Sequence, residues 1–169
     1  MDPEIYSLLP YLTHLDLGDN HISTLNSKEF KYLTDLKALN LDGNRVSSIS
    51  NSMFSQQTQL ETLNLARNEL SMLSPLSFTN LKNLTELDLS YNKLEHVDAT
   101  LLKPIESNLK RLVLSGNHIP IGEIRDLLWR NKVLKVLEIA DCGLTEITEF
   151  VLPEELTALV LANLYFQKN

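Results

Sequence analysis

The sequence is poor in cysteine, in long apolar runs and in positive charge. Its one cysteine, Cys142, rules out a disulfide within the chain. No apolar run approaches the roughly 20 residues that a membrane-spanning helix needs, and no charged-then-apolar segment of the signal-peptide type opens the sequence. The net charge of −7 argues against nucleic acid, because phosphate binding requires a clustered positive field. These absences predict no nucleic-acid partner and no membrane insertion by these residues.

What the sequence does contain is a leucine pattern that returns at a nearly fixed period. The copy from Leu84 to Leu94 has leucines at relative positions 1, 4, 6 and 11 and an asparagine at position 9. Seven copies of this frame, of varying fidelity, begin at Leu12, Leu36, Leu60, Leu84, Leu109, Leu134 and Leu156. The steps between them are 24, 24, 24, 25, 25 and 22 residues. A fixed period of this size is typical of a solenoid.

The leucine spacing has a physical reason. In an extended segment successive side chains point to opposite faces, so positions 4 and 6 share one face while positions 3, 5 and 7 share the other. One strand per repeat, stacked on its neighbours, predicts a parallel sheet with a leucine core behind it. At position 9 the chain turns away from the strand, where a side-chain amide can satisfy buried backbone groups. The predicted ladder consists of Asn20, Asn44, Asn68, Asn92 and Asn117, followed by Cys142.

The repeat frame also sets the expected domain boundaries. Residues 1–11 match the back half of a repeat whose strand is missing, and residues 1–162 are expected to form one domain. Because no atypical capping repeat is recognisable, the domain is interpreted as part of a longer array. Asn163 to Gln167 resemble most of a viral-protease recognition sequence used to remove purification tags. Residues 163–169 are therefore left outside the domain, although a degenerate natural repeat is the alternative.

The back half of each repeat is expected to cover the core on the convex side. A phenylalanine follows the opening leucine by 18 residues in three repeats, which predicts a buried spine of Phe30, Phe54 and Phe78. The second repeat departs from the pattern by placing Gln57 where the others have leucine. In the fifth repeat, apolar residues at helical spacing predict a short helix through Ile121, Ile124, Leu127 and Leu128. Trp129 lies near the end of this helix. The helix is interpreted as a cover for the core, in preference to a site that binds a partner.

With 24-residue units and a phenylalanine in the back half, residues 12–108 resemble the typical class of leucine-rich repeat. That class is common in extracellular receptors and adhesion proteins such as Slit, chaoptin, the Toll-like receptors and the acid-labile subunit family. The resemblance implies an α/β leucine-rich repeat solenoid: a right-handed curved array with a parallel β-sheet on its concave face and a mostly irregular or short-helical convex side. It leaves function open, because such solenoids host many unrelated partners.

Three functions remain compatible with the sequence. The favoured one is a protein-interaction module of an extracellular or cell-surface receptor or adhesion protein, which binds a protein ligand through the concave face. A sequon at Asn83, in Asn83-Leu84-Thr85, is the candidate glycosylation site of such a protein. The alternative is a cytoplasmic scaffold or regulatory subunit. An enzyme is disfavoured, and no cofactor or metal is expected, because no catalytic or ligand constellation is recognisable.

The candidate binding residues are those that the frame places on the outer face of the sheet or at its edge. They are His14, Asp16, Asn40, Asp42, Asn64, Arg67, Glu86, Asp88, Tyr91, Arg111 and Glu138. Acidic residues dominate the first four repeats, so the expected partner carries a basic patch there, with Arg67 and Tyr91 as anchors. Lys110, Arg111 and Lys135 mark the fifth and sixth repeats. The alternative is that aspartate and asparagine at position 5 are usual for this repeat and merely solvated.

Self-association is the first testable prediction. The ends of a cut array leave leucine-lined surface uncovered, and exposed apolar patches tend to find partners. We therefore expect end-to-end or edge association at high protein concentration, which light scattering should detect as a mass that rises with concentration. A strictly monomeric mass throughout the millimolar range would contradict this expectation.

Overall fold

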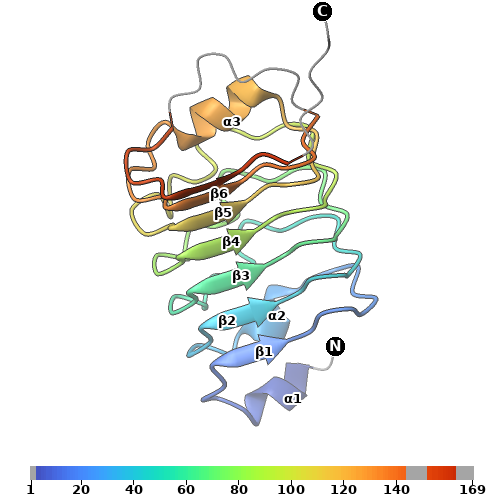
Figure 1. The fold of residues 1–169 in the computed structure, drawn as a ribbon. Helices are drawn as coiled ribbons and strands as arrows, with labels where there is room; N and C mark the ends of the chain where they lie inside the picture. Colours follow the sequence, from blue (N-terminus) through green and yellow to red (C-terminus); the bar gives the residue numbers. More distant parts are fainter. Residues whose placement is uncertain (1–2, 144–151, 163–169) are drawn as a thin grey trace, which may run out of the picture.

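The computed structural model describes residues 3–143 and 152–162 and shows a stack of repeats, each of which opens with a short strand (Figure 1). The strands are β1 (His14–Asp16), β2 (Ala38–Asn40), β3 (Thr62–Asn64), β4 (Glu86–Asp88), β5 (Arg111–Val113), β6 (Val136–Glu138) and β7 (Ala158–Val160). They form one parallel sheet in the order β1 to β7, so each strand pairs with its neighbours in the sequence. The predicted α/β solenoid is confirmed. The tail at 163–169 lies outside the described residues.

The register aligns equivalent residues of successive repeats. Leu39 is the partner of Leu15 on one side and of Leu63 on the other. The central leucines of five strands are at most 1% exposed: Leu39, Leu63, Leu87, Leu112 and Leu137. Leu15 and Leu159, in β1 and β7, are only partly buried. Because burying a leucine contributes about 1.5–3 kcal/mol, stacking supplies stability that one repeat alone does not have.

The predicted asparagine ladder is present, and Asn68 shows how it works. Its side-chain Nδ2 donates to the carbonyl oxygens of Leu41 (2.9 Å), Leu65 (3.2 Å) and Ala66 (2.9 Å). Its Oδ1 accepts the N–H of Val46 at 2.9 Å. One buried amide therefore satisfies backbone groups of its own turn and of the preceding repeat, which ties the two repeats together.

Other members of the ladder make related contacts. Asn44 and Asn92 likewise donate to carbonyl oxygens of their own and the preceding repeat. Cys142, the sixth member, is buried, and its Sγ lies 3.5 Å from the carbonyl oxygens of Leu114 and Ala140. Burial raises the pKa of this thiol above its ordinary value. A buried, protonated thiol suits the structural role assigned to it.

The convex side carries the predicted phenylalanines. Phe30, Phe54 and Phe78 are all buried, and Phe30 is the last residue of α2 (Ser27–Phe30). The ring of Tyr6, in α1 (Pro3–Ser7), stacks on Phe30 with 6.3 Å between ring centroids. Buried Gln57 explains the departure from leucine, because its Nε2 donates to the carbonyl oxygen of Phe30 at 2.7 Å. The amide thus satisfies a turn of the preceding repeat.

The helix predicted in the fifth repeat is α3 (Ile121–Leu128). Its buried residues are Ile124, Leu127 and Leu128. Glu123, in the first turn of α3, contacts the preceding repeat. Its Oε2 accepts the N–H of Val97 at 2.8 Å, and its Oε1 lies 3.0 Å from Nδ1 of His96. The hydrogen bond between the two side chains raises the pKa of His96 and lowers that of Glu123.

The N-terminal end of the stack exposes apolar side chains. Leu8 and Tyr11 are 79% and 84% exposed, and Ile5 and Leu9 are about half exposed. This surface suits the self-association expected above, which stays a prediction. None of the helices in the described residues is long and apolar enough to cross a lipid bilayer.

The ladder leads to a stability prediction. Asn68→Ala should lower the free energy of unfolding by about 2–4 kcal/mol, because several buried backbone groups lose their partner. Asn20→Ala is the matched control, since Asn20 is exposed and, among the described residues, its side chain contacts only carbonyl oxygens of its own turn. This change should cost less than about 1 kcal/mol. Urea denaturation measures both values, and equal losses would contradict the role given to the ladder.

Candidate protein interface

The concave face is formed by the side chains at positions 3 and 5 of each repeat, on the outer side of the sheet. Every strand has three residues, and its middle residue points into the core, so the first and third point outward. Eight predicted binding residues lie on this face: His14, Asp16, Asn40, Asn64, Glu86, Asp88, Arg111 and Glu138. Asp42, Arg67 and Tyr91 lie beside it, in the turns that follow the strands. The structure thus gathers all the candidates on the face and its adjoining edge, without testing whether they bind.

Aspartate and asparagine at position 5 hold the turn after the strand. In each of the first four repeats, a side-chain oxygen accepts the N–H two residues ahead, at 2.8–3.0 Å. The residues are Asp16, Asn40, Asn64 and Asp88. This contact is an Asx turn. Sequence reasoning weighed only binding and solvation and missed this third role, although the recurrence of Asp or Asn two residues before the turn was visible.

The fifth and sixth repeats lack the Asx turn of the first four. Position 5 of the fifth repeat is Val113, the last residue of β5, which is buried and has no side-chain oxygen. In the sixth repeat the N–H of Ala140 donates to Oγ of Ser115 at 3.1 Å. Glu138, which occupies position 5 there, is instead paired with the guanidinium of Arg111 on the neighbouring strand. Arg111, expected to mark a basic region, therefore has its charge compensated on the face.

Arg67 is held in place at the edge of the sheet. The backbone at this position is left-handed, with φ of +50° at Arg67 and +66° at Gly43 of the preceding repeat. Nε of Arg67 donates to Oδ1 of Asp42 at 2.8 Å, and Nη2 reaches Oδ1 of Asp19 at 3.1 Å. The hydrogen bond to Asp42, more than the other contacts, raises the pKa of the guanidinium. A Cβ at Gly43 would lie 2.3 Å from that Asp19 oxygen, so only glycine leaves room for this bridge.

Tyr91 lies along the same edge in a similar way. Its φ is +50°, and its hydroxyl is 3.4 Å from Oδ2 of Asp141, two repeats further on. The intervening residue is Gly116, where a Cβ would lie 2.4 Å from the ring. Tyr91 is nevertheless 54% exposed. Its ring is therefore positioned before any partner arrives, which reduces the entropy lost on binding.

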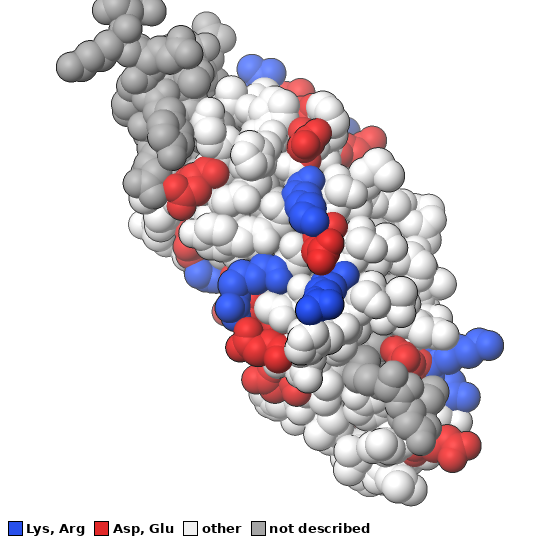
Figure 2. All heavy atoms as spheres, turned by 90° about the vertical axis from the view of Figure 1, so that its right-hand side faces the viewer, with Lys and Arg blue, Asp and Glu red and all other residues white. Residues whose placement is uncertain are grey.

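The acidic character predicted for the first four repeats is confined to fewer residues than expected. Arg67 compensates Asp19 and Asp42. Within residues 3–143 and 152–162, no ion pair involves Asp16, Glu86 or Asp88. Figure 2 shows the side on which the strands end, where basic and acidic side chains lie next to one another along the stack. The uncompensated acids are thus on the concave face itself.

A shallow hollow of about 350 Å³ lies over β1 to β3. Its lining includes His14, Asp16, Ala38, Asn40 and Thr62. Nδ2 of Asn40 donates to Oδ1 of Asp16 at 2.8 Å, which fixes both side chains. His14 contacts Oγ1 of Thr13 at 2.9 Å. No group of three His, Cys, Asp or Glu side chains in the described residues is placed to hold a metal ion. The hollow therefore offers hydrogen-bonding groups and a carboxylate to a partner.

Comparison with known proteins assigns the family. The model of the leucine rich repeat family matches residues 1–46, 34–94 and 58–119, which is more than half of the chain. The chain belongs to the leucine-rich repeat family. This fold is generally a non-enzymatic scaffold for interactions, which agrees with a binding surface on the sheet. No curated protein matches the sequence.

Two solved structures resemble this leucine-rich repeat protein. A leucine-rich repeat protein of Leptospira interrogans has a TM-score of 0.77 and 28% identity, over 96% of this chain and 40% of its own. TLR13, solved in a complex with ssRNA13, has a TM-score of 0.69 and 28% identity, over 90% of this chain and 22% of its own. The chain thus spans less than half the length of either structure. The finer likeness to extracellular receptors stays a prediction.

The Asx turns predict different effects for two changes at one position. Asp88→Ala should lower the free energy of unfolding by about 1–2 kcal/mol, because the N–H and hydroxyl of buried Ser90 lose their acceptor. Asp88→Asn removes the charge and keeps an oxygen acceptor, so its cost should stay below about 0.5 kcal/mol. Urea denaturation separates the two. Similar losses for both variants would show that the charge, not the turn, matters.

Proposed function

We propose that this leucine-rich repeat protein binds a protein ligand through the concave face of β1 to β4, as the recognition part of an extracellular receptor or adhesion protein. The observation that carries the proposal is the group of uncompensated carboxylates on that face: Asp16, Glu86 and Asp88. Asp16 and Asp88 are oriented by backbone contacts. A basic partner surface would meet charges that are already positioned, which favours selectivity and fast association.

The edge beside the face supports the same proposal. Tyr91 offers an exposed ring, and Arg67 offers a guanidinium whose geometry is set by two carboxylates. Tyrosine and arginine are enriched among the residues that dominate binding energy. Because both side chains are ordered without a partner, less free energy is spent on fixing them at an interface.

An extracellular setting is proposed from the sequon and the resemblance to Toll-like receptors. Asn83 is exposed, and its Nδ2 donates to the carbonyl oxygen of Thr58 at 2.9 Å. A glycosylated amide nitrogen retains one hydrogen, so this contact and a glycan are compatible. Secretion from a eukaryotic host should add a glycan that Asn83→Gln abolishes, as measured by mass spectrometry. An unmodified Asn83 in the secreted protein would count against the glycoprotein part of the proposal.

The binding test compares variants that remove charge without removing acceptors. The chain is screened against arrays of extracellular and cytosolic proteins, and each ligand found is titrated with Asp16→Asn/Glu86→Gln/Asp88→Asn. Loss of three charge contacts on the concave face should weaken binding by about tenfold or more, with slower association. The matched control is Asp35→Asn/Glu95→Gln/Glu106→Gln, which removes three acids outside the strands. Its affinity should stay within about twofold of the unmodified chain.

Two outcomes would overturn this proposal. Ligands whose affinity is unchanged in the concave variant would place binding elsewhere. Ligands found only among the cytosolic proteins would replace the receptor with an intracellular scaffold, even if the concave face is the surface used.

A further inference from the structure

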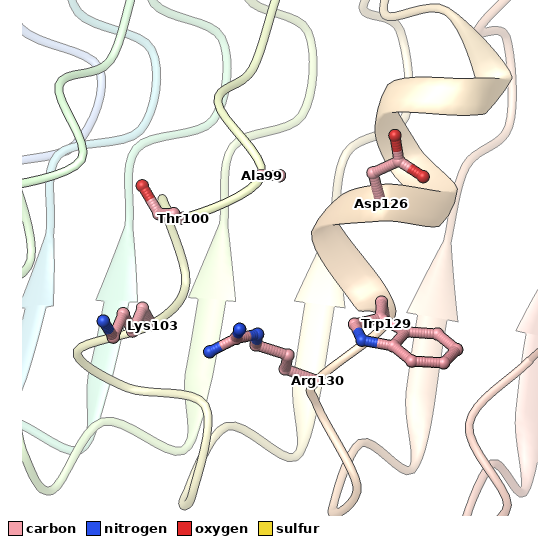
Figure 3. A pocket seen from close by; sticks show the side chains of 6 residues that line it. All are labelled: Ala99, Thr100, Lys103, Asp126, Trp129 and Arg130. Carbon is pink, nitrogen blue, oxygen red and sulfur yellow. The ribbon is translucent and has the colours of Figure 1, made fainter.

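The convex side carries two adjoining hollows that sequence reasoning did not foresee. The first, of about 350 Å³, lies between the fourth repeat and α3 and is lined by Ala99, Thr100, Lys103, Asp126, Trp129 and Arg130 (Figure 3). The second, of about 450 Å³, lies between the third and fourth repeats. Thr100 and Lys103 line both. The two hollows thus adjoin at Thr100 and Lys103 and extend across three repeats, and we call them together the convex groove.

The charges of the convex groove are positive and uncompensated. Lys82, Lys103 and Arg130 line it, and within residues 3–143 and 152–162 none of them forms an ion pair. Figure 3 shows the Arg130 side chain extending from the end of α3 toward Lys103. The one acidic residue in the lining, Asp126, is already paired with Arg125 at 3.2 Å. Three free cations in one groove contrast with the net charge of −7 of the chain.

Exposed apolar side chains mark both ends of the groove. Trp129, at the end of α3, is 72% exposed, and Leu76, in the third repeat, is 53% exposed. Pro75 and Pro104 add further apolar surface near Leu76. Large exposed side chains beside unpaired charges are typical of surfaces that bind another protein.

We propose that the convex groove is a second binding site, which takes an acidic, extended segment of a partner protein with apolar residues at its two ends. Glutamate or aspartate side chains would pair with Lys82, Lys103 and Arg130, and the flanking apolar residues would cover Leu76 and Trp129. Two repeat steps span at least about 10 Å, which an extended segment covers with roughly three to four residues. The proposal is independent of the concave face, because it uses other residues on the opposite side.

Nucleic acid fits the groove less well. Single-stranded nucleic acid is bound by a continuous positive track with several aromatic rings on which bases stack. The groove has three cations, one aromatic ring and an apolar margin of leucine and proline. Short acidic segments match this alternation of charge and apolar surface better than a phosphate backbone does.

Trp129 makes the proposal directly measurable, since it is the only tryptophan of the chain. The probe is a peptide of four glutamates flanked by leucines, titrated into the full chain while the Trp129 emission is followed. We expect a saturable change in emission at concentrations below about 1 mM. The same peptide with glutamines in place of the glutamates should give no saturable change. A partner on the concave face would leave this signal unaltered.

Matched variants distinguish binding in the convex groove from an effect of the overall charge of the chain. Lys103→Glu/Arg130→Glu should weaken peptide binding by about tenfold or more, because two attractions become repulsions. Lys110→Glu/Lys135→Glu changes the net charge equally, at residues just before β5 and β6, and should change affinity by no more than about threefold. Circular dichroism checks that both variants fold.

Each remaining outcome would overturn the proposal. These outcomes are no saturable emission change with the glutamate peptide, an equal response to the glutamine peptide, and equal losses in the two double variants. Tighter binding of an oligouridylate of the same length, lost in Lys103→Glu/Arg130→Glu, would reassign the groove to nucleic acid.

Discussion

The structure depends on buried side-chain amides that satisfy the backbone of each turn. Asn44, Asn68, Asn92 and Asn117 each donate to carbonyl oxygens of their own turn and of the repeat before. Without such an amide, several peptide groups of a repeat would be buried without partners, each at a cost of about 1–3 kcal/mol. The ladder therefore sets the register of the repeats, and the register decides which residues share a face.

The same requirement shapes the candidate interface. Asp16 and Asp88 point outward from the sheet, yet each also satisfies the N–H of a turn. The same two side chains therefore stabilise the turns and face the ligand. Their oxygen atoms accept the turn N–H groups, and their negative charge remains available to a ligand. Arg67 is held by Asp42 and Asp19, and the ring of Tyr91 lies over Gly116, where a Cβ would be 2.4 Å from it. The edge of the sheet is ordered by packing between repeats and is available before any partner binds.

Two faces of the solenoid carry uncompensated charge of opposite sign. The concave face has carboxylates at Asp16, Glu86 and Asp88, whereas the convex groove has cations at Lys82, Lys103 and Arg130. Other charged residues on these surfaces form ion pairs, as Arg111 does with Glu138 and Arg125 does with Asp126. The two proposed sites rest on these two sets of residues.

The leucine period was enough to predict the strands and the ladder, and the helical spacing of apolar residues in the fifth repeat was enough to predict α3, because both patterns are local properties of a chain. Local patterns also named the residues of the concave face, although binding by them stays a prediction. Contacts between side chains of different repeats could not be predicted from these local patterns. Gln57 with Phe30, Glu123 with Val97, and Arg67 above Gly43 each join residues 24 or more positions apart. Only the packed stack brings such side chains together, and it alone decides which charges remain unpaired.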